Sequence, residues 1–158
     1  MKSPAQTGYT LIEILVVMVI MGILFTAGYV NLRDYARAQT LTAVARSLVT
    51  DLHSAEENAN AGDKPSGCNG VLNGYQFNVI SSTTYELDAF CTGGNVQVKP
   101  VILPADLTIS APVPNPVVFK SIAEGTNIAS GATATIIITQ TSTKNTRTIT
   151  IGANGSIQ

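Results

Sequence analysis

Residues 9–30 read YTLIEILVVMVIMGILFTAGYV, and this stretch decides how the rest of the chain is interpreted. Its only charged side chain is Glu13. About 20 consecutive apolar residues are enough to cross a bilayer as a helix, whereas a helix on the surface of a soluble domain would show a polar stripe. We therefore predict that residues 9–30 form the membrane half of an N-terminal helix.

After this segment the apolar side chains take on helical spacing. They recur at Leu41, Val44, Leu48, Leu52, Ala55 and Ala59. Steps of three and four residues indicate one apolar face of a helix. The charged residues of this segment are expected to fall outside that stripe, namely Arg46, Asp51, Glu56 and Glu57. Gly62 is the first stop signal. The helix is expected to continue to about residue 61, with residues 31–61 as its amphipathic half.

Residues 62–158 are predicted to form a β-sheet head. Alternating runs rich in β-branched residues predict strands at residues 75–80, 84–90, 96–103, 107–110, 117–120, 133–139 and 146–151. The proline-rich stretch 112–116 is a connection, because proline donates no amide to a sheet. The predicted fold class is α+β, a lollipop whose long helix packs its second half on an antiparallel sheet.

The composition points away from nucleic acids and from catalysis. The net charge is −1, and the nine Lys and Arg residues are scattered, so no basic patch is expected to bind phosphates. His53 is the only histidine and has no partners at metal-ligand spacing, while Asp88 and Asp106 look isolated. No enzymatic activity, cofactor or metal is predicted.

The segment Gly8-Tyr9-Thr10-Leu11-Ile12-Glu13 resembles the processing site of type IV prepilins and pseudopilins. The resemblance implies that residues 1–8 are a leader peptide, that a prepilin peptidase cuts between Gly8 and Tyr9, and that a methyltransferase then methylates the amine of Tyr9. The family usually has Phe where this chain has Tyr9.

The spacing between Tyr9 and Glu13 has a physical meaning of its own. A carboxylate in the apolar part of a membrane helix costs about 2.5–3.5 kcal/mol unless it is paired. Cleavage would create a positive amine on Tyr9, about one helical turn from Glu13. Glu13 could neutralise that amine or the amine of an adjacent subunit, which would make it an assembly residue. The alternatives are an accidental acid in a signal anchor, or a secretory signal peptide cut near residues 26–28.

The resemblance also suggests the kind of protein. The second half of the helix and the late strands resemble H-type minor pseudopilins of type II secretion and related minor pilins. This implies a structural subunit in the inner membrane, with the head extracytoplasmic, that assembles into a pilus or periplasmic pseudopilus. Its partners would be other pilin subunits, the processing enzymes, an inner-membrane assembly platform and membrane lipid. A major pilin, a DNA-uptake pilin and a plain membrane-anchored domain are the alternatives.

Cys68 and Cys91 are the only two cysteines. In an extracytoplasmic domain such a pair is expected to form a disulfide, whereas two free thiols would remain if the head stayed in the cytosol. DNA binding would need a basic stripe on the head, which the sequence does not supply.

Overall fold

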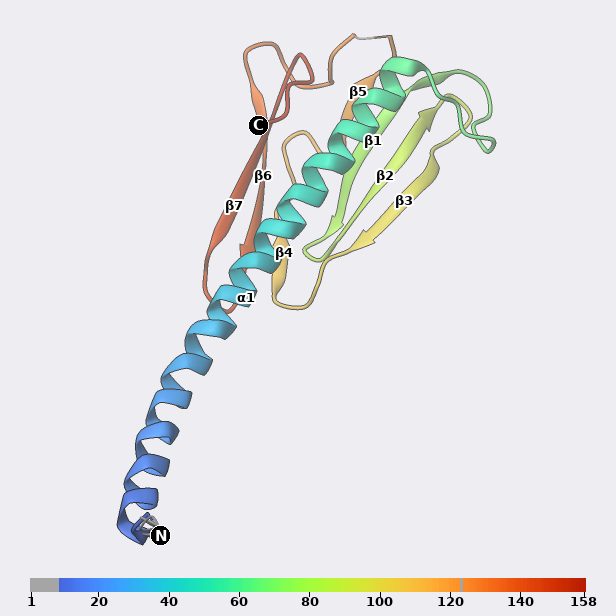
Figure 1. Ribbon diagram of the computed structural model, residues 1–158. Helices are drawn as coiled ribbons and strands as arrows, with labels where there is room; N and C mark the ends of the chain where they lie inside the picture. Colours follow the sequence, from blue (N-terminus) through green and yellow to red (C-terminus); the bar gives the residue numbers. More distant parts are fainter. Residues whose placement is uncertain (1–8, 123) are drawn as a thin grey trace, which may run out of the picture. The chain divides into compact units, whose positions relative to one another are not determined.

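The computed structural model describes residues 9–122 and 124–158, without the side chains of residues 27–31. The elements of this part of the chain are drawn in Figure 1. They are α1 (Leu11–Ala61), β1 (Leu72–Ser81), β2 (Thr84–Cys91), β3 (Val96–Ile102), β4 (Leu107–Ile109), β5 (Val117–Lys120), β6 (Thr133–Gln140) and β7 (Thr146–Gly152). The chain forms two compact units, of which the first ends at Arg37 and the second covers Ala38–Gln158.

The helix ends where the sequence predicts, and backbone chemistry explains the position. Gly62 has a φ of 65°, a left-handed conformation that suits glycine. The amide of Gly62 donates to the carbonyl of Ala59 at 3.2 Å, and the amide of Asp63 donates to that of Asn58 at 3.0 Å. These two bonds make a Schellman motif, which satisfies carbonyls at the end of the helix.

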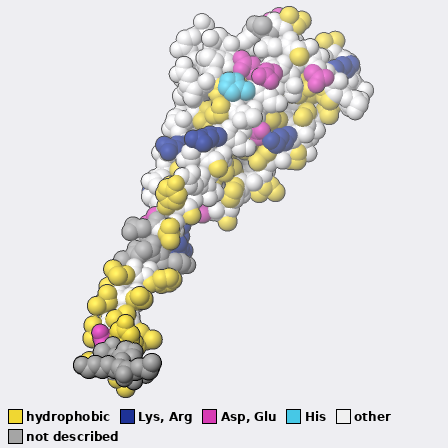
Figure 2. All heavy atoms as spheres, viewed as in Figure 1, with side chains coloured by type: hydrophobic (Ala, Val, Ile, Leu, Met, Phe, Trp, Pro, Cys, Tyr) yellow, Lys and Arg dark blue, Asp and Glu magenta, His cyan; other side chains and the backbone are white. Residues whose placement is uncertain are grey.

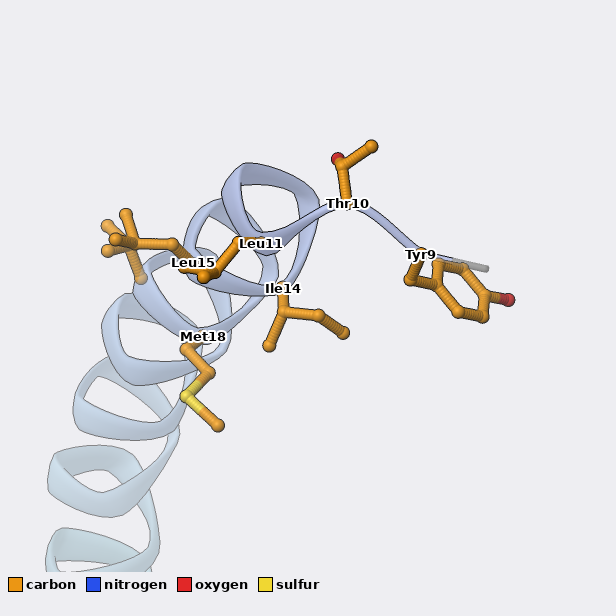
Figure 3. Close-up of a pocket in the computed structure, with 7 residues that line it drawn as sticks. Tyr9, Thr10, Leu11, Ile14, Leu15 and Met18 are labelled. Atoms are coloured by element: carbon orange, nitrogen blue, oxygen red, sulfur yellow. The ribbon is translucent and has the colours of Figure 1, made fainter. Parts of the chain in front are cut away.

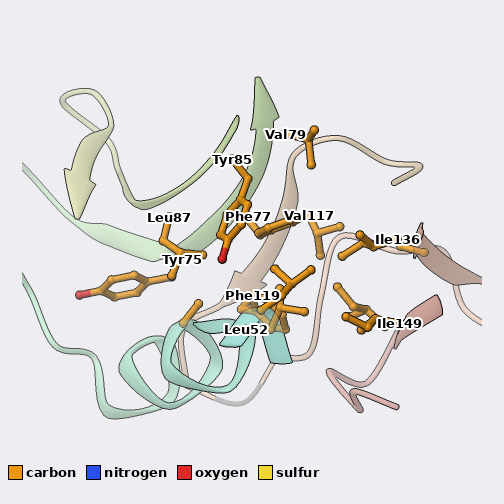
Figure 4. Packing of buried hydrophobic residues seen from close by; sticks show 14 of the residues in the cluster. Leu52, Tyr75, Phe77, Val79, Tyr85, Leu87, Val117, Phe119, Ile136 and Ile149 are labelled. Atoms are coloured by element: carbon orange, nitrogen blue, oxygen red, sulfur yellow. The ribbon is translucent and has the colours of Figure 1, made fainter. Parts of the chain in front are cut away.

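The second unit is built around the apolar face of α1. The predicted stripe is confirmed, since Leu41, Leu48, Leu52, Ala55 and Ala59 are all buried. They belong to the same core as inward side chains of the strands, some of which are shown in Figure 4. The rings of two of these residues, Phe77 and Tyr85, lie 5.3 Å apart at 48°. An amphipathic helix segment packed on strands confirms the α+β class.

The strands divide between two antiparallel sheets. The larger sheet has the order β3-β2-β1-β5, and the smaller has the order β4-β6-β7. Each predicted strand is present, and β1 begins three residues earlier than expected. The alternation of side chains predicts where strands occur, but it does not say which strands pair. The division into two sheets is therefore new information from the structure.

Two asparagine side chains complete the hydrogen bonding of β1 and β5, Asn115 where the two strands stop pairing and Asn127 along the outer edge of β5. Asn115 accepts from the amide of Val79 at 3.0 Å and donates to its carbonyl at 3.0 Å. Asn127 accepts from the amide of Val118 at 2.9 Å and donates to the carbonyl of Pro116 at 3.0 Å. Each side-chain amide takes the place of a neighbouring strand residue, so these backbone amides and carbonyls keep hydrogen-bond partners.

The edge strand β3 carries features that oppose pairing with another chain. It contains Pro100, and its register with β2 shifts so that Val98 is an extra residue. Lys99, also in β3, reaches Asp51 of α1. Proline, bulges and lysine at a sheet edge all disfavour the addition of a further strand.

Candidate processing and assembly site

Helix α1 starts at the predicted processing motif. The amide of Glu13 donates to the carbonyl of Thr10 at 3.1 Å and lies 3.4 Å from the hydroxyl of Thr10. The amide of Ile14 donates to the same carbonyl at 3.3 Å. Thr10 is thus the N-cap, and Thr-x-x-Glu is the spacing of a capping box.

This position gives Glu13 a local reason to be acidic. It lies in the first turn of α1, where the exposed amides give the helix a partial positive charge. A carboxylate is favoured there even before a partner is considered. The sequence analysis assigned Glu13 to assembly alone and missed the capping spacing, although Thr10-x-x-Glu13 was visible in the sequence.

The two described residues of the processing motif that the sequence singled out are open to a partner. Tyr9 is 81% exposed just before α1, and Glu13 is exposed in the first turn of α1. Gly8, the residue before the predicted cut, lies outside the described residues, as does the rest of the predicted leader 1–8. The structure therefore places Tyr9 two residues before the start of α1 and Glu13 in its first turn, and it does not describe the bond between residues 8 and 9.

Apolar side chains surround this helix start. A hollow of about 690 Å³ has a lining that includes Tyr9, Leu11, Ile14, Leu15 and Met18. Figure 3 shows these side chains at the start of α1. Within the described part of the chain nothing apolar covers these side chains, and exposed apolar surface favours an apolar environment or partner.

The same character continues along α1 beyond this hollow. Ile23, Leu24 and Phe25 are exposed. Thr26 turns its hydroxyl back to the carbonyls of Gly22 and Ile23, at 3.0 and 2.9 Å, so its polar group is satisfied inside the helix. Among the residues that the structure describes, no helix has the length and apolarity that crossing a bilayer requires.

The head contains the expected disulfide. Cys68 and Cys91 are bonded, with their Cα atoms 5.7 Å apart. The bond joins the connection that follows α1 to the last residue of β2. This link holds the loop against the larger sheet.

Asp51 was predicted to fall outside the apolar stripe of α1, but it lies against the core. It is buried, and it accepts hydrogen bonds from the hydroxyl of Tyr85 at 2.9 Å and the ammonium of Lys99 at 2.6 Å. Burial, and then the bonded and charged carboxylate of Asp51, raise the pKa of Tyr85 well above its usual value. Asp51 follows Leu48 by three residues and precedes Ala55 by four, a spacing that already indicated the inner face.

Asp88 is not isolated either. It is buried, and it accepts a hydrogen bond from the side-chain amide of Gln76 at 2.9 Å. Its other oxygen, Oδ1, has no hydrogen-bond partner among the described residues. Burial raises the pKa of Asp88, the Gln76 bond lowers it, and the nearby carboxylate of Glu86 raises it again. The net effect is upward.

Asp106 organises a turn. Its carboxylate accepts from the hydroxyl of Thr141 at 2.6 Å and from the amide of Ser142 at 2.8 Å. His53 lies on the exposed side of α1, with Nδ1 3.4 Å from Glu56. Within residues 9–122 and 124–158, no three His, Cys, Asp or Glu side chains are placed to hold a metal ion.

Comparison with known proteins gives one family match. Residues 3–29 match the model of the prokaryotic N-terminal methylation motif. No curated protein and no solved structure matches the chain. The matched stretch contains Gly8, Tyr9 and Glu13 and covers the start of α1.

Proposed function

We propose that the chain, which carries an N-terminal methylation motif, is a type IV prepilin-like protein. Within that class we propose a minor pilin or pseudopilin, a structural subunit of a type IV pilus or a type II secretion pseudopilus. The motif over residues 3–29 carries the pilin-like part of this proposal. It implies processing by a prepilin peptidase and assembly with other pilin subunits.

Processing creates the charge that assembly uses. Removal of residues 1–8 leaves a new amine on Tyr9, which is then methylated. Methylation leaves the amine basic, so it stays a cation at neutral pH. In an inner-membrane anchor this cation and the Glu13 carboxylate both lie at the apolar start of α1, where an unpaired charge costs a few kcal/mol.

Pairing between subunits removes that cost. When α1 helices of neighbouring subunits pack, Glu13 of one subunit can meet the Tyr9 amine of another. The high exposure of Tyr9 and Glu13 supports this exchange, because neither side chain is buried within its own chain. An amine satisfies a carboxylate only at the same depth, so the pairing also sets the axial register of the helices.

The head then lies outside the cytoplasm, on the filament surface or at its tip. The Cys68–Cys91 disulfide supports this location, because disulfides persist in oxidising compartments. The assignment to the minor subunits rests on the resemblance of the second helical half to H-type pseudopilins. A major subunit would use the same chemistry at Tyr9 and Glu13.

The first experiment measures the intact mass of the protein isolated from membranes of cells that contain a prepilin peptidase. We expect the mass of residues 9–158 with one added methyl group and one disulfide. A chain that retains residues 1–8 would contradict the proposal and would favour a plain membrane-anchored domain.

The second experiment separates processing from assembly with Glu13→Gln. We expect the leader to be removed and sheared filaments to fall by at least about tenfold, because one buried unpaired amine corresponds to more than about 1.4 kcal/mol. Asp34→Asn is the matched control, since it removes an exposed acid of the same helix that pairs with Arg37 at 3.6 Å. Normal filament yield from Glu13→Gln would refute the pairing mechanism.

A further inference from the structure

The head has a groove between α1 and β7 that the proposed assembly through Tyr9 and Glu13 does not use. The groove has a volume of about 550 Å³, and its apolar lining includes Ala45, Val49 and Ile149. Arg46 of α1 and Arg147 of β7 also line it, and both are exposed. We call this feature the α1–β7 groove.

The two arginines bring positive charge to the groove, whose lining also includes Gln158. Among the described residues, the guanidinium groups of Arg46 and Arg147 form no ion pair. Arginine presents a planar set of donors that matches a carboxylate. An apolar lining with two such groups beside it suits a partner surface that is partly apolar and acidic.

The β7 edge adds unsatisfied backbone groups to the same groove. Thr150 donates to the carbonyl of Gln158 at 2.8 Å and accepts from its amide at 3.0 Å, so Thr150 faces away from β6. In an antiparallel strand every second residue points its amide and carbonyl the same way. Thr148, which lines the groove, therefore also faces outward, and no described residue bonds to its backbone.

The C-terminal end of α1 carries negative charge without a basic residue to balance it. Helix C-termini favour basic residues because the exposed carbonyls carry a partial negative charge. The last turn of α1 has no basic residue, and Glu56 and Glu57 precede it. Glu57 is exposed, and no described residue pairs with it. On the face in Figure 2, acidic side chains gather toward the upper end of the head, and most basic ones lie farther down.

Arg46 and Glu57 lie on one stripe of α1. Arg46, Thr50, His53 and Glu57 follow at steps of four, three and four residues, and all four are exposed. Arg46 and Glu57 are separated by about 16 Å along the helix axis at 1.5 Å per residue. Arg46 and Glu57 therefore lie on the same face of α1, at different positions along the helix axis.

We propose that the α1–β7 groove is the docking site for a second copy of this chain, which inserts the acidic end of its α1 at Glu57 between Arg46 and Arg147. The contact is heterologous, since the groove of one head meets the helix end of the next. Repetition of such a contact builds an open filament rather than a closed dimer. This inference rests on the proposed function in its major-subunit form, because a contact repeated between copies of this chain needs many copies in one filament. It adds a contact between neighbouring heads to the pairing at Tyr9 and Glu13.

The first test exchanges the charges in the full-length chain, in cells that assemble it. Arg46→Glu and Glu57→Arg are each expected to lower the yield of sheared filaments by at least about tenfold, because like charges across an interface are strongly disfavoured. The double variant restores opposite charges and is expected to return the yield to within about twofold of the unmodified chain. Lys144→Glu, which reverses an exposed charge that does not line the groove, is the matched control and should have no effect.

Two outcomes of the exchange would overturn the proposal. Single reversals that leave the yield unchanged would mean that the groove is not an assembly contact. A double variant as poor as the worse single variant would mean that Arg46 and Glu57 do not meet each other, so that a different protein occupies the groove.

The second test reads the contact in membranes without requiring filaments. Two differently tagged copies are co-produced, one with Ala43→Cys, one turn from Arg46, and one with Ser54→Cys, three residues before Glu57. A short bismaleimide is expected to give the mixed cross-linked dimer and little of either homodimer. Homodimers alone would overturn the heterologous arrangement.

The cross-link also separates this inference from the proposed function. A mixed dimer formed by a chain that retains residues 1–8 would keep the head contact and reject the pilin processing. A chain that is processed and forms filaments, yet gives no mixed dimer, would keep the pilin function and reject the groove contact.

Discussion

Residues 11–37 and 38–61 belong to the same helix, yet their apolar side chains meet different surroundings. In the first part, side chains such as Leu24 and Phe25 are exposed. In the second part, Leu48 and Leu52 are fully buried in the core of the head. The backbone is the same, so the difference lies in what stabilises each part. The head stabilises the second part from within the chain, whereas no described residue covers the apolar side chains of the first part.

Leucine truncation gives the sharpest test of this difference. Leu52→Ala should lower the free energy of unfolding of the head by about 4 kcal/mol, because it leaves a cavity in a closed core. Leu24→Ala removes the same atoms from a side chain that is 67% exposed and should not change it. Urea unfolding of the full chain in detergent micelles, followed by near-UV circular dichroism, measures both. Equal losses of stability from the two substitutions would contradict the proposed difference between the two parts of α1.

Opening the disulfide should have the next largest effect, and only on the head. The Cys68–Cys91 bond closes a loop of about 24 residues, so its loss should cost about 3 kcal/mol. The urea midpoint of the Cys68→Ser/Cys91→Ser variant should fall, while removal of residues 1–8 proceeds as before. An unchanged midpoint would show that the loop contributes little to the stability of the head.

The buried acid in the second part of the helix should matter where an exposed acid in the first part does not. Asp51→Asn should destabilise the head by about 2 kcal/mol, because the carboxylate accepts from both Tyr85 and Lys99. Asp34→Asn should change stability by less than about 0.5 kcal/mol, since its pair with Arg37 is exposed. Similar effects of the two substitutions would contradict the burial argument.

The smallest expected effect is a gain in stability at Asp88. A carboxyl whose pKa is raised in the folded state holds its proton more tightly there than in the unfolded chain. The stability from this group is complete below the unfolded pKa and is lost as the pH rises through the folded pKa. Asp88→Asn should therefore stabilise the head at neutral pH by about 1 kcal/mol and remove this part of the pH dependence. Thermal melts of the variant and of the unmodified chain at about pH 4 and about pH 7 measure this difference in stability.

Much of the fold could be predicted from local spacing. The apolar period of three and four residues gave the buried face of α1, and alternation gave every strand. The pairing into two sheets could not be predicted, because strand partners are chosen by contacts between residues far apart in sequence. Gln76 and Asp88, for example, meet across β1 and β2 only once the register is set.

The candidate site was predictable in part for a similar reason. Gly8, Tyr9 and Glu13 are adjacent in sequence, so a motif can reveal them. Asp51 was predicted to fall outside the apolar stripe of α1 because its charge was given more weight than its spacing from Leu48. Its partners Tyr85 and Lys99 come from two different strands, and no local sequence pattern predicts contacts between residues so far apart.

The asparagine side chains at Asn115 and Asn127, together with Pro100, have a consequence for a chain that is meant to polymerise. Subunits crowded in one membrane could also join through their sheets, and such growth would be irregular and hard to reverse. By occupying or blunting the margins of β1, β5 and β3, these residues make that competing route unfavourable at these strands. Contacts between subunits are thereby left to surfaces other than these strand edges.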